Sequence, residues 1–356
     1  MPPFFSICIP QYNRTSFLIK ALQRLSEQSF RDFEICIADD LSPDGRQQEV
    51  IDFLRSAGLN FKFEINPTNL RYDGNLRAAI ALSSGRYCVL MGNDDGLSHP
   101  DVLKEFHAVL SVRPQCGVLI SNYREESGTI VSRIRFEADY QGNPWIAASV
   151  WRDFSFVSGI VFIGEQARGL ATNRFDGTEY YQLYLGSRII STGFQYCVRT
   201  FASVDKDLQV AGEDVDSYRM RPKKQVRAFS YFPSTLAHLI RLVSEGMENV
   251  GTESERRRAR LHALWQFYCF TMPFWLIEYR RIQSWSYSSA LGISLRPKIN
   301  APFALGVPGR LLANIIWSTV YVCALVVPIS VFFAFKPMLH RIAKFMRPRN
   351  ATKLST

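Results

Sequence analysis

Four clusters of polar side chains each follow a short apolar segment in the first 100 residues, and their side-chain types suit the binding of a metal and a diphosphate. Adjacent carboxylates are the oxygen ligands that a hard divalent cation prefers, with phosphate oxygens and water completing its shell. Such a cation neutralises a diphosphate leaving group. An aromatic ring beside it offers a face to a nucleobase. The clusters are Pro10 to Arg14, Asp39 and Asp40, Asn66 to Arg71, and Asn93 to Asp95.

The hydrophobic pattern predicts the elements that must position these clusters. Short β-prone runs alternate with segments whose apolar residues recur at helical spacing, which is typical of βαβ units and a mostly parallel sheet. In an open sheet of this α/β class the ligand lies beyond the carboxyl ends of the strands, where all four clusters stand. We expect strands over residues 4–9, 33–38, 61–65 and 87–91, and helices over 17–25, 50–54 and 75–83.

Each cluster taken alone is also compatible with an ordinary turn. Asp39 and Asp40 precede Ser-Pro-Asp-Gly, and Asn93 to Asp95 precede a glycine, which are common turn sequences. Their joint placement after strands of one sheet favours a site. The sequence has no G-x-G-x-x-G and no G-x-x-x-x-G-K-[ST] segment, so neither a dinucleotide fingerprint nor a P-loop explains the clusters. It also has no H-E-x-x-H and no C-x-x-C, so a zinc site is not expected.

The first roughly 120 residues contain three ordered motifs, SICIPQYNR, ICIADDLSPD and NLRYDGNLRAAIALSSGRYCVLMGNDD. With these motifs, this part of the chain resembles the nucleotide-binding half of a family 2 glycosyltransferase of the bacterial surface-polysaccharide type, and the last motif matches the family's pattern without a gap. The resemblance implies the GT-A fold, a Rossmann-like, mixed and mostly parallel sheet flanked by helices. It also implies a nucleotide-sugar donor and Mn²⁺ or Mg²⁺ as cofactor.

The same resemblance implies a role for each matching residue. Asp94 would hold the sugar-nucleotide and share the metal with Asp95, which we favour as the principal ligand. Gly92 stands where the family often has a further acid, so the metal ligands depart from the family's pattern there. The residues expected at the nucleotide are Pro10, Tyr12, Arg14, Asp39, Asp40, Arg71 and Asp94.

The second half of such enzymes binds the acceptor and supplies a general base, which implies inversion at the anomeric carbon. Two pairs of carboxylates compete for this role. Asp176 and Glu179 precede a helix-like stretch in the order that the family shows, whereas Glu213 and Asp214 match the family's Glu-Asp motif by letters but come later. We favour the first pair on position. For either pair, a carboxylate that only stabilises a helix start is equally compatible.

Several apolar residues before that region are candidates for contact with the acceptor. Residues 154–162 are expected to form a strand, in which Gly159 would allow close approach of a substrate. Trp145 and Trp151 could stack on sugar rings. Plain core packing is the alternative for all of them.

Charge is divided unevenly between the two parts of the chain. Residues 1–218 hold 21 Lys and Arg against 27 Asp and Glu, whereas residues 219–356 hold 21 against 5. In the second part basic residues alternate with aromatic runs, and residues 311–335 carry no charge, which favours an anionic membrane surface over nucleic acid. Pro328 interrupts this run and both flanks are basic, so a single crossing, a re-entrant pair and an in-plane pair of helices are all compatible. A buried helix of a soluble domain is the alternative.

We therefore expect a GT-A domain over residues 1–218 and a helical, membrane-associated region over 219–356. Within the domain, residues 1–120 would bind the nucleotide-sugar and residues 121–218 the acceptor. No secretory signal precedes the first strand, so the cytoplasmic face of the inner membrane is the expected location.

The function expected from these features is transfer of a sugar from a nucleotide-sugar to a polyprenyl-diphosphate-linked saccharide in cell-surface polysaccharide synthesis. The alternatives are transfer to the polyprenyl phosphate itself, a sugar nucleotidyltransferase, and a non-catalytic sugar-nucleotide-binding scaffold. A nucleotidyltransferase usually carries a Gly-rich basic loop after its first strand, which PQYNRTSF lacks. A scaffold does not need the aspartate pair that this chain has.

Overall fold

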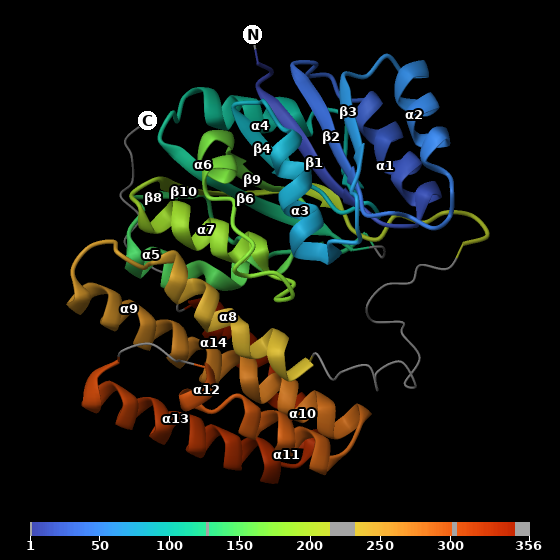
Figure 1. Cartoon of the computed structure of the whole chain (residues 1–356). Helices are drawn as coiled ribbons and strands as arrows, with labels where there is room; N and C mark the ends of the chain where they lie inside the picture. The colour runs from blue at the N-terminus through green and yellow to red at the C-terminus, as the bar shows by residue number, and fades with distance from the viewer. Residues whose placement is uncertain (1, 126–127, 214–231, 301–304, 346–356) are drawn as a thin grey trace.

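The computed structural model describes residues 2–125, 128–213, 232–300 and 305–345, with a β-sheet domain above a layer of helices in Figure 1. The first four long strands are parallel and lie in the order β3, β2, β1, β4. The α/β prediction is confirmed for this half, and each expected element is present. These elements are β1 (Phe5–Gln11), α1 (Thr15–Ser26), β2 (Phe33–Asp39), α2 (Gln47–Ser56), β3 (Phe61–Ile65), α3 (Arg71–Leu82) and β4 (Tyr87–Leu90).

The remaining strands make the sheet mixed. β9 (Ile160–Ile163) inserts antiparallel between β4 and β6 (Cys116–Arg124), and β10 (Gln195–Asp205) then pairs parallel to β6. The whole path runs β3-β2-β1-β4-β9-β6-β10-β5, with short strands β7 and β8 on β6 and β10. The other elements of this part are β5 (Gly96–Leu97), α4 (Val102–Ser111), β7 (Ile130–Val131), β8 (Ala138–Tyr140), α5 (Pro144–Val150), the 3₁₀ helix η1 (Trp151–Ser155), α6 (Gly164–Gly169) and α7 (Tyr181–Ser191).

Helices cover both faces of the sheet. Because both faces are buried, its strands consist of consecutive apolar residues and do not alternate between apolar and polar ones. Along β1, Ile7 and Ile9 pack with Leu18 of α1 on one face, and Cys8 packs with Leu76 of α3 on the other. All five side chains are fully buried. Burial on both faces fixes the register of β1 and therefore the position of the polar residues that follow it.

The C-terminal helices extend the same core. α8 packs on α7 and α9 packs on α5, and one cluster of buried residues runs from Cys8 in the sheet to Ala324 near the far end of the chain. Thr252 and Glu255 form a reciprocal capping box that starts α9. The domain boundary expected at 218/219 lies outside the described residues. The helices are α8 (Phe232–Gly246), α9 (Glu253–Gln266), the π-helical turn η3 (Phe267–Thr271), α10 (Met272–Ile282), α11 (Trp285–Ser294), α12 (Pro297–Asn300), α13 (Gly306–Val326) and α14 (Ile329–Phe345).

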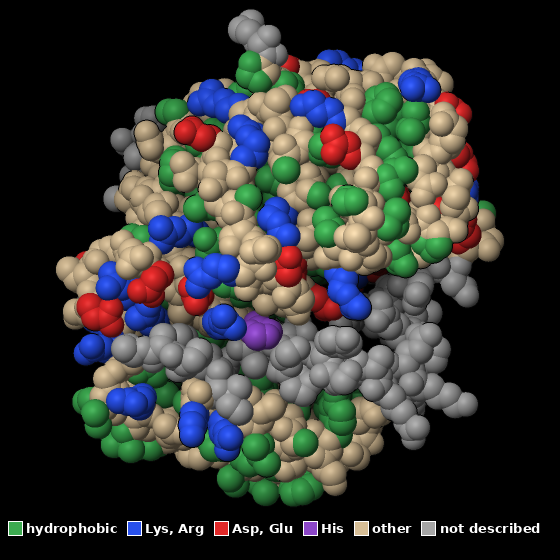
Figure 2. Space-filling model, in the orientation of Figure 1, with side chains coloured by type: hydrophobic (Ala, Val, Ile, Leu, Met, Phe, Trp, Pro, Cys, Tyr) green, Lys and Arg blue, Asp and Glu red, His purple; other side chains and the backbone are tan. Residues whose placement is uncertain are grey.

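The uncharged run over residues 311–335 is divided between α13 and α14, because the chain is extended at Val327 and continues with Pro328. Among the described residues, α13 is the one helix long and apolar enough to cross a membrane, with a mean hydropathy of 1.5 over a window that is 22% buried. Figure 2 shows hydrophobic side chains along the lower edge of the molecule, with Lys and Arg above them. The exposed apolar side chains of α13 are Val307, Leu311, Leu312, Ile315, Val322 and Val326.

The segment expected as one strand over residues 154–162 is only partly a strand. Its first residues belong to η1, and β9 begins at Ile160. Gly159 has φ +79°, and a Cβ there would lie 2.8 Å from the Ser203 hydroxyl oxygen and 2.9 Å from Val204. The close approach predicted at Gly159 is therefore an approach to β10 within the protein.

Candidate active site

Loops with left-handed backbone surround the carboxyl ends of the strands. Of the seven non-glycine residues with positive φ in the described part of the chain, six lie in these loops. This conformation costs an L-residue of the order of 1–2 kcal/mol, and residues held in it tend to cluster at functional sites. The concentration of strain therefore marks this edge as the candidate site. The six residues are Asn13, Arg14, Leu41, Arg71, Glu179 and Asp207.

Asp94 and Arg14 connect the loop after β4 to the loop after β1. The Arg14 guanidinium pairs with Asp94 Oδ2 and lies 4.3 Å from the centroid of the Phe17 ring. The Nη2 atom of Arg14 is buried and has no hydrogen-bond partner among the described residues. Because a buried N–H is costly to leave unpaired, this atom is available to an acceptor such as a phosphate oxygen.

Asp95 is more buried than Asp94, with 4% of its surface exposed. Its Oδ2 accepts a hydrogen bond from the Ser158 hydroxyl, and its Oδ1 accepts one from the backbone N–H of Asp207 at 2.9 Å. Burial, and to a lesser extent the neighbouring Asp94, raises the pKa of Asp95 to about 7. A bound cation would reverse this shift, because positive charge favours the ionised carboxylate.

Gly92 allows the two aspartates to lie close to the preceding backbone. A Cβ at Gly92 would lie 3.0 Å from Asp94 Oδ1, 3.2 Å from Asp95 Oδ2 and 3.3 Å from the Ser158 hydroxyl. The Gly92 N–H also donates to the Ser158 hydroxyl at 2.8 Å. The absence of a side chain at this position is therefore part of how the pair is arranged.

Asp39 and Asp40 are both buried at the end of β2 and stabilise loops. Asp39 accepts from the backbone N–H and the hydroxyl of Ser42, at 2.9 and 2.7 Å. Asp40 accepts from the N–H groups of Leu70 and Arg71, at 2.6 and 2.8 Å, and thereby positions the loop before α3. In this structure both carboxylates accept hydrogen bonds from backbone N–H groups of the loops that form the crevice walls.

A chain of amide hydrogen bonds links the strand ends to one another. Asn66 donates to Asp40 at 3.0 Å and to Asn75 Oδ1 at 2.9 Å, and Asn75 donates to the carbonyl oxygen of Gln11 at 3.0 Å. Gln11 Oε1 in turn accepts from Asn93 at 2.8 Å. The network holds the ends of β1 and β2 and the loop after β4 in one fixed arrangement.

The other residues expected at the nucleotide lie around the same crevice. Tyr12 is 45% exposed in the loop after β1, where its ring can meet a base, and Pro10 is half-buried within β1. Arg71 is exposed at the first residue of α3, with its left-handed backbone held by Asp40. The structure therefore brings all the predicted donor-side residues to one edge of the sheet.

Asp73, which the sequence did not mark as functional, positions the acceptor side. Its carboxylate is buried and accepts from the N–H groups of Glu179 at 2.8 Å and Tyr181 at 3.0 Å. Thr178 donates to the same carboxylate at 3.4 Å. The start of α7 is thus held against the start of α3, which forms the opposite wall of the crevice.

Two of the predicted base candidates lie on this wall. Asp176 forms a two-contact ion pair with Arg77 of α3, whereas Glu179 is exposed. Burial, together with nearby groups that include both Glu179 and Asp95, raises the pKa of Tyr72. Glu179 and Asp95 therefore both lie close enough to the Tyr72 phenol for their charges to act on it.

The second pair of base candidates is described only in part. Glu213 is exposed. It lies near Arg46 at the start of α2, since its charge, after those of Glu49 and Asp44, contributes to raising the pKa of Arg46. Asp214 lies outside the described residues. The chain before Glu213 crosses from Asp95 toward α1, where the Lys20 ammonium donates to the Gln209 carbonyl oxygen.

The donor atoms of Asp94 and Asp95 suit a hard divalent cation that also binds a diphosphate. Within the described residues no group of three or more His, Cys, Asp or Glu side chains could hold a metal by itself. Two carboxylates plus phosphate oxygens and water are the coordination that Mg²⁺ and Mn²⁺ commonly adopt. The pair fits such an ion when the donor contributes its oxygens.

Three further residues show the limits of the sequence prediction. Trp151 is 3% exposed and packs against Phe267, which is the core packing stated as the alternative for it. Ser158, in the turn before β9, and Asp207, just after β10, hold Asp95 although both are far from it in the sequence. No local motif marks them, because a residue that contacts the site from a distant loop has no characteristic spacing.

Comparison with known sequences identifies the first part of the chain. Residues 6–146 match glycosyl transferase family 2. Abequosyltransferase RfbV of Salmonella typhimurium is 41% identical over 99 residues, covering 26% of this chain and 28% of RfbV. Glycosyltransferase AmsB of amylovoran biosynthesis in Erwinia amylovora is 34% identical over 102 residues, 28% of this chain and 34% of AmsB. The glucosyltransferase of Campylobacter jejuni that is named for GalNAc(5)-diNAcBac-PP-undecaprenol is 29% identical over 27% of this chain and 31% of its own length. The matches therefore span about a third of each relative.

Solved structures share the fold over nearly the whole chain. TarS of S. aureus, residues 1–349 in complex with UDP, superposes with a TM-score of 0.60 at 15% identity, covering 90% of each chain. Mannosyltransferase PcManGT of Pyrobaculum calidifontis, in complex with GDP-Man and Mn²⁺, gives 0.53 at 14% identity, covering 97% of this chain and 86% of PcManGT. The sheet with flanking helices is that of GT-A glycosyltransferases.

Proposed function

We propose that this chain, which carries a glycosyl transferase family 2 domain over residues 6–146, transfers a sugar with inversion from a nucleotide-sugar to a lipid-linked saccharide. The observation that carries the proposal is the meeting of three features at one strained edge of the sheet. These are the buried Asp95 beside Asp94, the Arg14 guanidinium with an unpaired N–H, and Glu179 on the opposite wall. The first two suit a diphosphate and the third suits an acceptor hydroxyl.

The donor side would bind the nucleotide along the ends of β1 and β2. Tyr12 would stack on the base, and the loops held by Asp39 and Asp40 would enclose the ribose. Arg14 and Arg71 would approach the diphosphate. PcManGT binds GDP-Man and TarS binds UDP on the same fold, which supports a nucleotide-sugar at this edge.

Asp95, with Asp94, would hold Mn²⁺ or Mg²⁺. When bound, the ion neutralises charge that develops on the departing diphosphate. The hydrogen bonds from Ser158 and from the Asp207 N–H fix the orientation of the Asp95 carboxylate. The presence of Mn²⁺ with GDP-Man in PcManGT supports this assignment.

Glu179 would act as the general base. It removes a proton from the acceptor hydroxyl while that oxygen forms a bond to the anomeric carbon, and the bond from that carbon to the diphosphate oxygen breaks on the opposite face. Asp73 fixes the backbone of Glu179, which limits the positions that the carboxylate can reach. We favour Glu179 over Asp176 because its charge acts on Tyr72 together with that of Asp95, which brings it near the proposed metal site.

The acceptor and location follow from the C-terminal helices. The Campylobacter relative is named for a substrate on undecaprenyl diphosphate, and the exposed apolar side chains of α13 with basic neighbours suit an anionic membrane surface. We place the protein on the cytoplasmic face of the inner membrane, with α13 and α14 in contact with lipid and without nucleic acid as a partner.

Release of nucleoside diphosphate from a panel of nucleotide-sugars, with membranes and either Mn²⁺ or EDTA, tests this function. We expect release only with metal and a loss of at least 100-fold in Asp95→Ala. Glu179→Gln should lose at least 100-fold at unchanged donor binding. Asp52→Asn, an exposed carboxylate on α2, is the matched control and should be fully active. Failure of every donor to bind or react, or full metal-dependent activity in Asp95→Ala, would contradict the proposal.

A further inference from the structure

A cavity of about 440 Å³ lies where the acceptor half of the sheet domain meets the C-terminal helices. Its walls come from η1, α7, α8, η3 and α10. Aromatic rings dominate the side toward the helices, where Phe270, Phe274 and Trp275 line it. A cavity of this size with mostly apolar walls is typical of a binding site for a small molecule or part of one.

This cavity adjoins the wall that carries the proposed base. Tyr180, the residue after Glu179, lines it. Gln182 donates to the Phe154 carbonyl oxygen at 3.2 Å and accepts from the Tyr72 hydroxyl at 3.2 Å, which ties the cavity wall to the crevice. Ser155 lines the cavity, and Ser158 three residues later holds Asp95. A molecule in the cavity would therefore enter the active site from the acceptor side.

Two guanidinium groups line the mostly apolar cavity. Arg133 donates to three backbone carbonyl oxygens, including those of Asp153 and Phe156. Arg152 lies 5.8 Å from the centroid of the Phe270 ring. Asp153 is the one carboxylate among the described lining residues, and its Oδ2 accepts from the Tyr196 hydroxyl at 2.6 Å. The described lining thus holds two guanidinium groups against one carboxylate, a balance that an anionic group on an apolar chain would complement.

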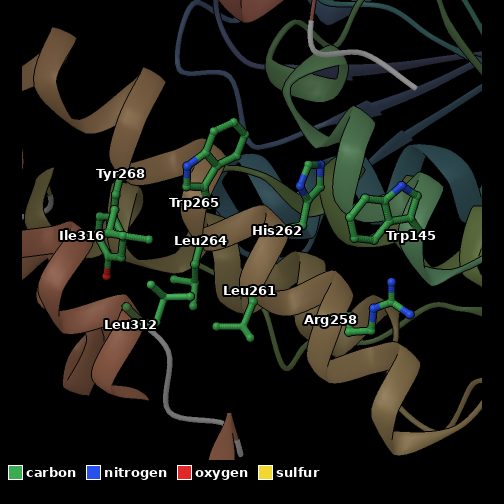
Figure 3. A pocket seen from close by; sticks show the side chains of 10 residues that line it. Trp145, Arg258, Leu261, His262, Leu264, Trp265, Tyr268, Leu312 and Ile316 are labelled. Atoms are coloured by element: carbon green, nitrogen blue, oxygen red, sulfur yellow. The ribbon is translucent and has the colours of Figure 1, made fainter. Parts of the chain in front are cut away.

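A second hollow of about 340 Å³ continues toward α13 (Figure 3). Figure 3 shows Leu261 and Leu264 of α9 on the side of Leu312 and Ile316 of α13, with Trp265 and His262 farther from them in the lining. The two hollows are neighbours, because the Trp265 ring makes an edge-to-face contact with the Phe270 ring of the first at 5.3 Å between centroids. Burial, followed by the charge of Arg152, lowers the pKa of His262. The Arg152 guanidinium is therefore close enough to the second hollow for its charge to affect a residue that lines it.

We propose that the two hollows together form the site for the lipid-diphosphate part of the acceptor, a proposal that rests on the function proposed above. The diphosphate lies at Arg152, and the isoprenoid chain runs past Phe270 and Trp265 to Leu312 on the exposed face of α13. The aromatic walls bury apolar chain, and the guanidinium pairs with phosphate oxygens. The saccharide then extends past Tyr180 toward Glu179.

Binding of prenyl diphosphates of increasing length, followed by tryptophan fluorescence without any donor, tests the site. We expect affinity to rise from isopentenyl to geranyl to farnesyl diphosphate, because each added unit buries more apolar surface. Arg152→Gln should weaken binding of all three by about tenfold or more. Leu312→Ser should weaken only farnesyl diphosphate. Arg86→Gln, an exposed arginine near the rings of Phe4 and Tyr87, is the matched control and should bind as the wild type does.

Two results would overturn the proposal. The first is equal affinity of the wild type and Arg152→Gln for farnesyl diphosphate, in variants whose UDP or GDP binding shows that they are folded. The second is displacement of farnesyl diphosphate by phosphatidylglycerol micelles at equal concentration, which would make the hollow a site for bulk lipid headgroups. Because no donor is present, loss of nucleotide binding in the wild type would count against the proposed function and not against this site.

Discussion

Glu34 is expected to stabilise the amino-terminal edge of the sheet, at the opposite end from the active site. This residue of β2 is 2% exposed. Its Oε1 accepts from the Ser6 hydroxyl at 2.7 Å and from the Ser84 N–H at 2.6 Å, and its Oε2 lies 2.9 Å from the Lys62 ammonium. One carboxylate thus joins β1, β2, β3 and the segment between α3 and β4. Glu34→Gln keeps the shape of the side chain and removes its charge.

The size of the effect follows from the pKa of Glu34. Burial alone raises that pKa, but the hydrogen bonds from Ser6, Lys62 and Ser84 outweigh burial and lower it from 4.5 to about 2. A difference of about 2.5 units corresponds to about 3 kcal/mol at neutral pH. Because the Lys62 side chain is 41% exposed, solvent screens part of this, and we expect Glu34→Gln to lose about 2 kcal/mol.

The pH dependence separates charge from packing. The folded pKa of Glu34 is depressed, so its contribution is fully present above about pH 4.5 and is lost as the pH falls toward 2. Urea unfolding at pH 7 and at a series of values down to pH 2.5 measures this. The stability difference between wild type and Glu34→Gln should stay constant from pH 7 to about pH 4.5 and shrink below that value. Glu64→Gln, exposed on the adjacent β3, is the control and should change stability by less than about 0.5 kcal/mol.

The reasoning would be refuted by a stability difference that stays constant from pH 7 to pH 2.5. Such a result would mean that Glu34→Gln acts through packing or through an unpaired Ser84 N–H and not through the ionised carboxylate. A difference below about 0.5 kcal/mol at pH 7 would contradict the assigned hydrogen bonds as a whole.

Three further predictions concern the active site and the membrane surface. Asp40→Asn leaves a backbone N–H of the loop before α3 without its acceptor, so donor KM should rise at least tenfold with little change in kcat, measured by initial rates. Gly92→Ala places a Cβ 3.0 Å from Asp94 Oδ1 and should weaken activation by Mn²⁺ about tenfold in metal titrations, whereas Gly169→Ala, with open space around its Cβ, should not. Leu311→Ser with Ile315→Ser removes two exposed apolar side chains from α13 and should reduce co-sedimentation with anionic vesicles; unchanged sedimentation would argue against α13 as the lipid contact.

Much of the donor side follows from local pattern. The apolar runs of β1, β2 and β4 are buried on both faces. Because such strands are parallel neighbours in one sheet, the polar residues that follow them lie at the same edge of that sheet. The alternation of strands and helices was therefore predictable, and so was the meeting of Tyr12, Asp39 and Asp95. The insertion of β9 antiparallel beside β4 was not, because register between distant strands depends on long-range packing that no local period reports.

The sequence by itself determined the α/β class, the carboxylates and arginine of the donor edge, and the basic, apolar character of the C-terminal part, because each depends on residue type and short spacing. Only the tertiary structure decided that Ser158 and Asp207 hold Asp95, that Asp73 anchors the backbone of Glu179, and that the C-terminal helices close a cavity against η1. The physical reason is that these contacts join residues tens to more than a hundred positions apart. Chain connectivity does not specify such pairings, and packing of the sheet and helices does.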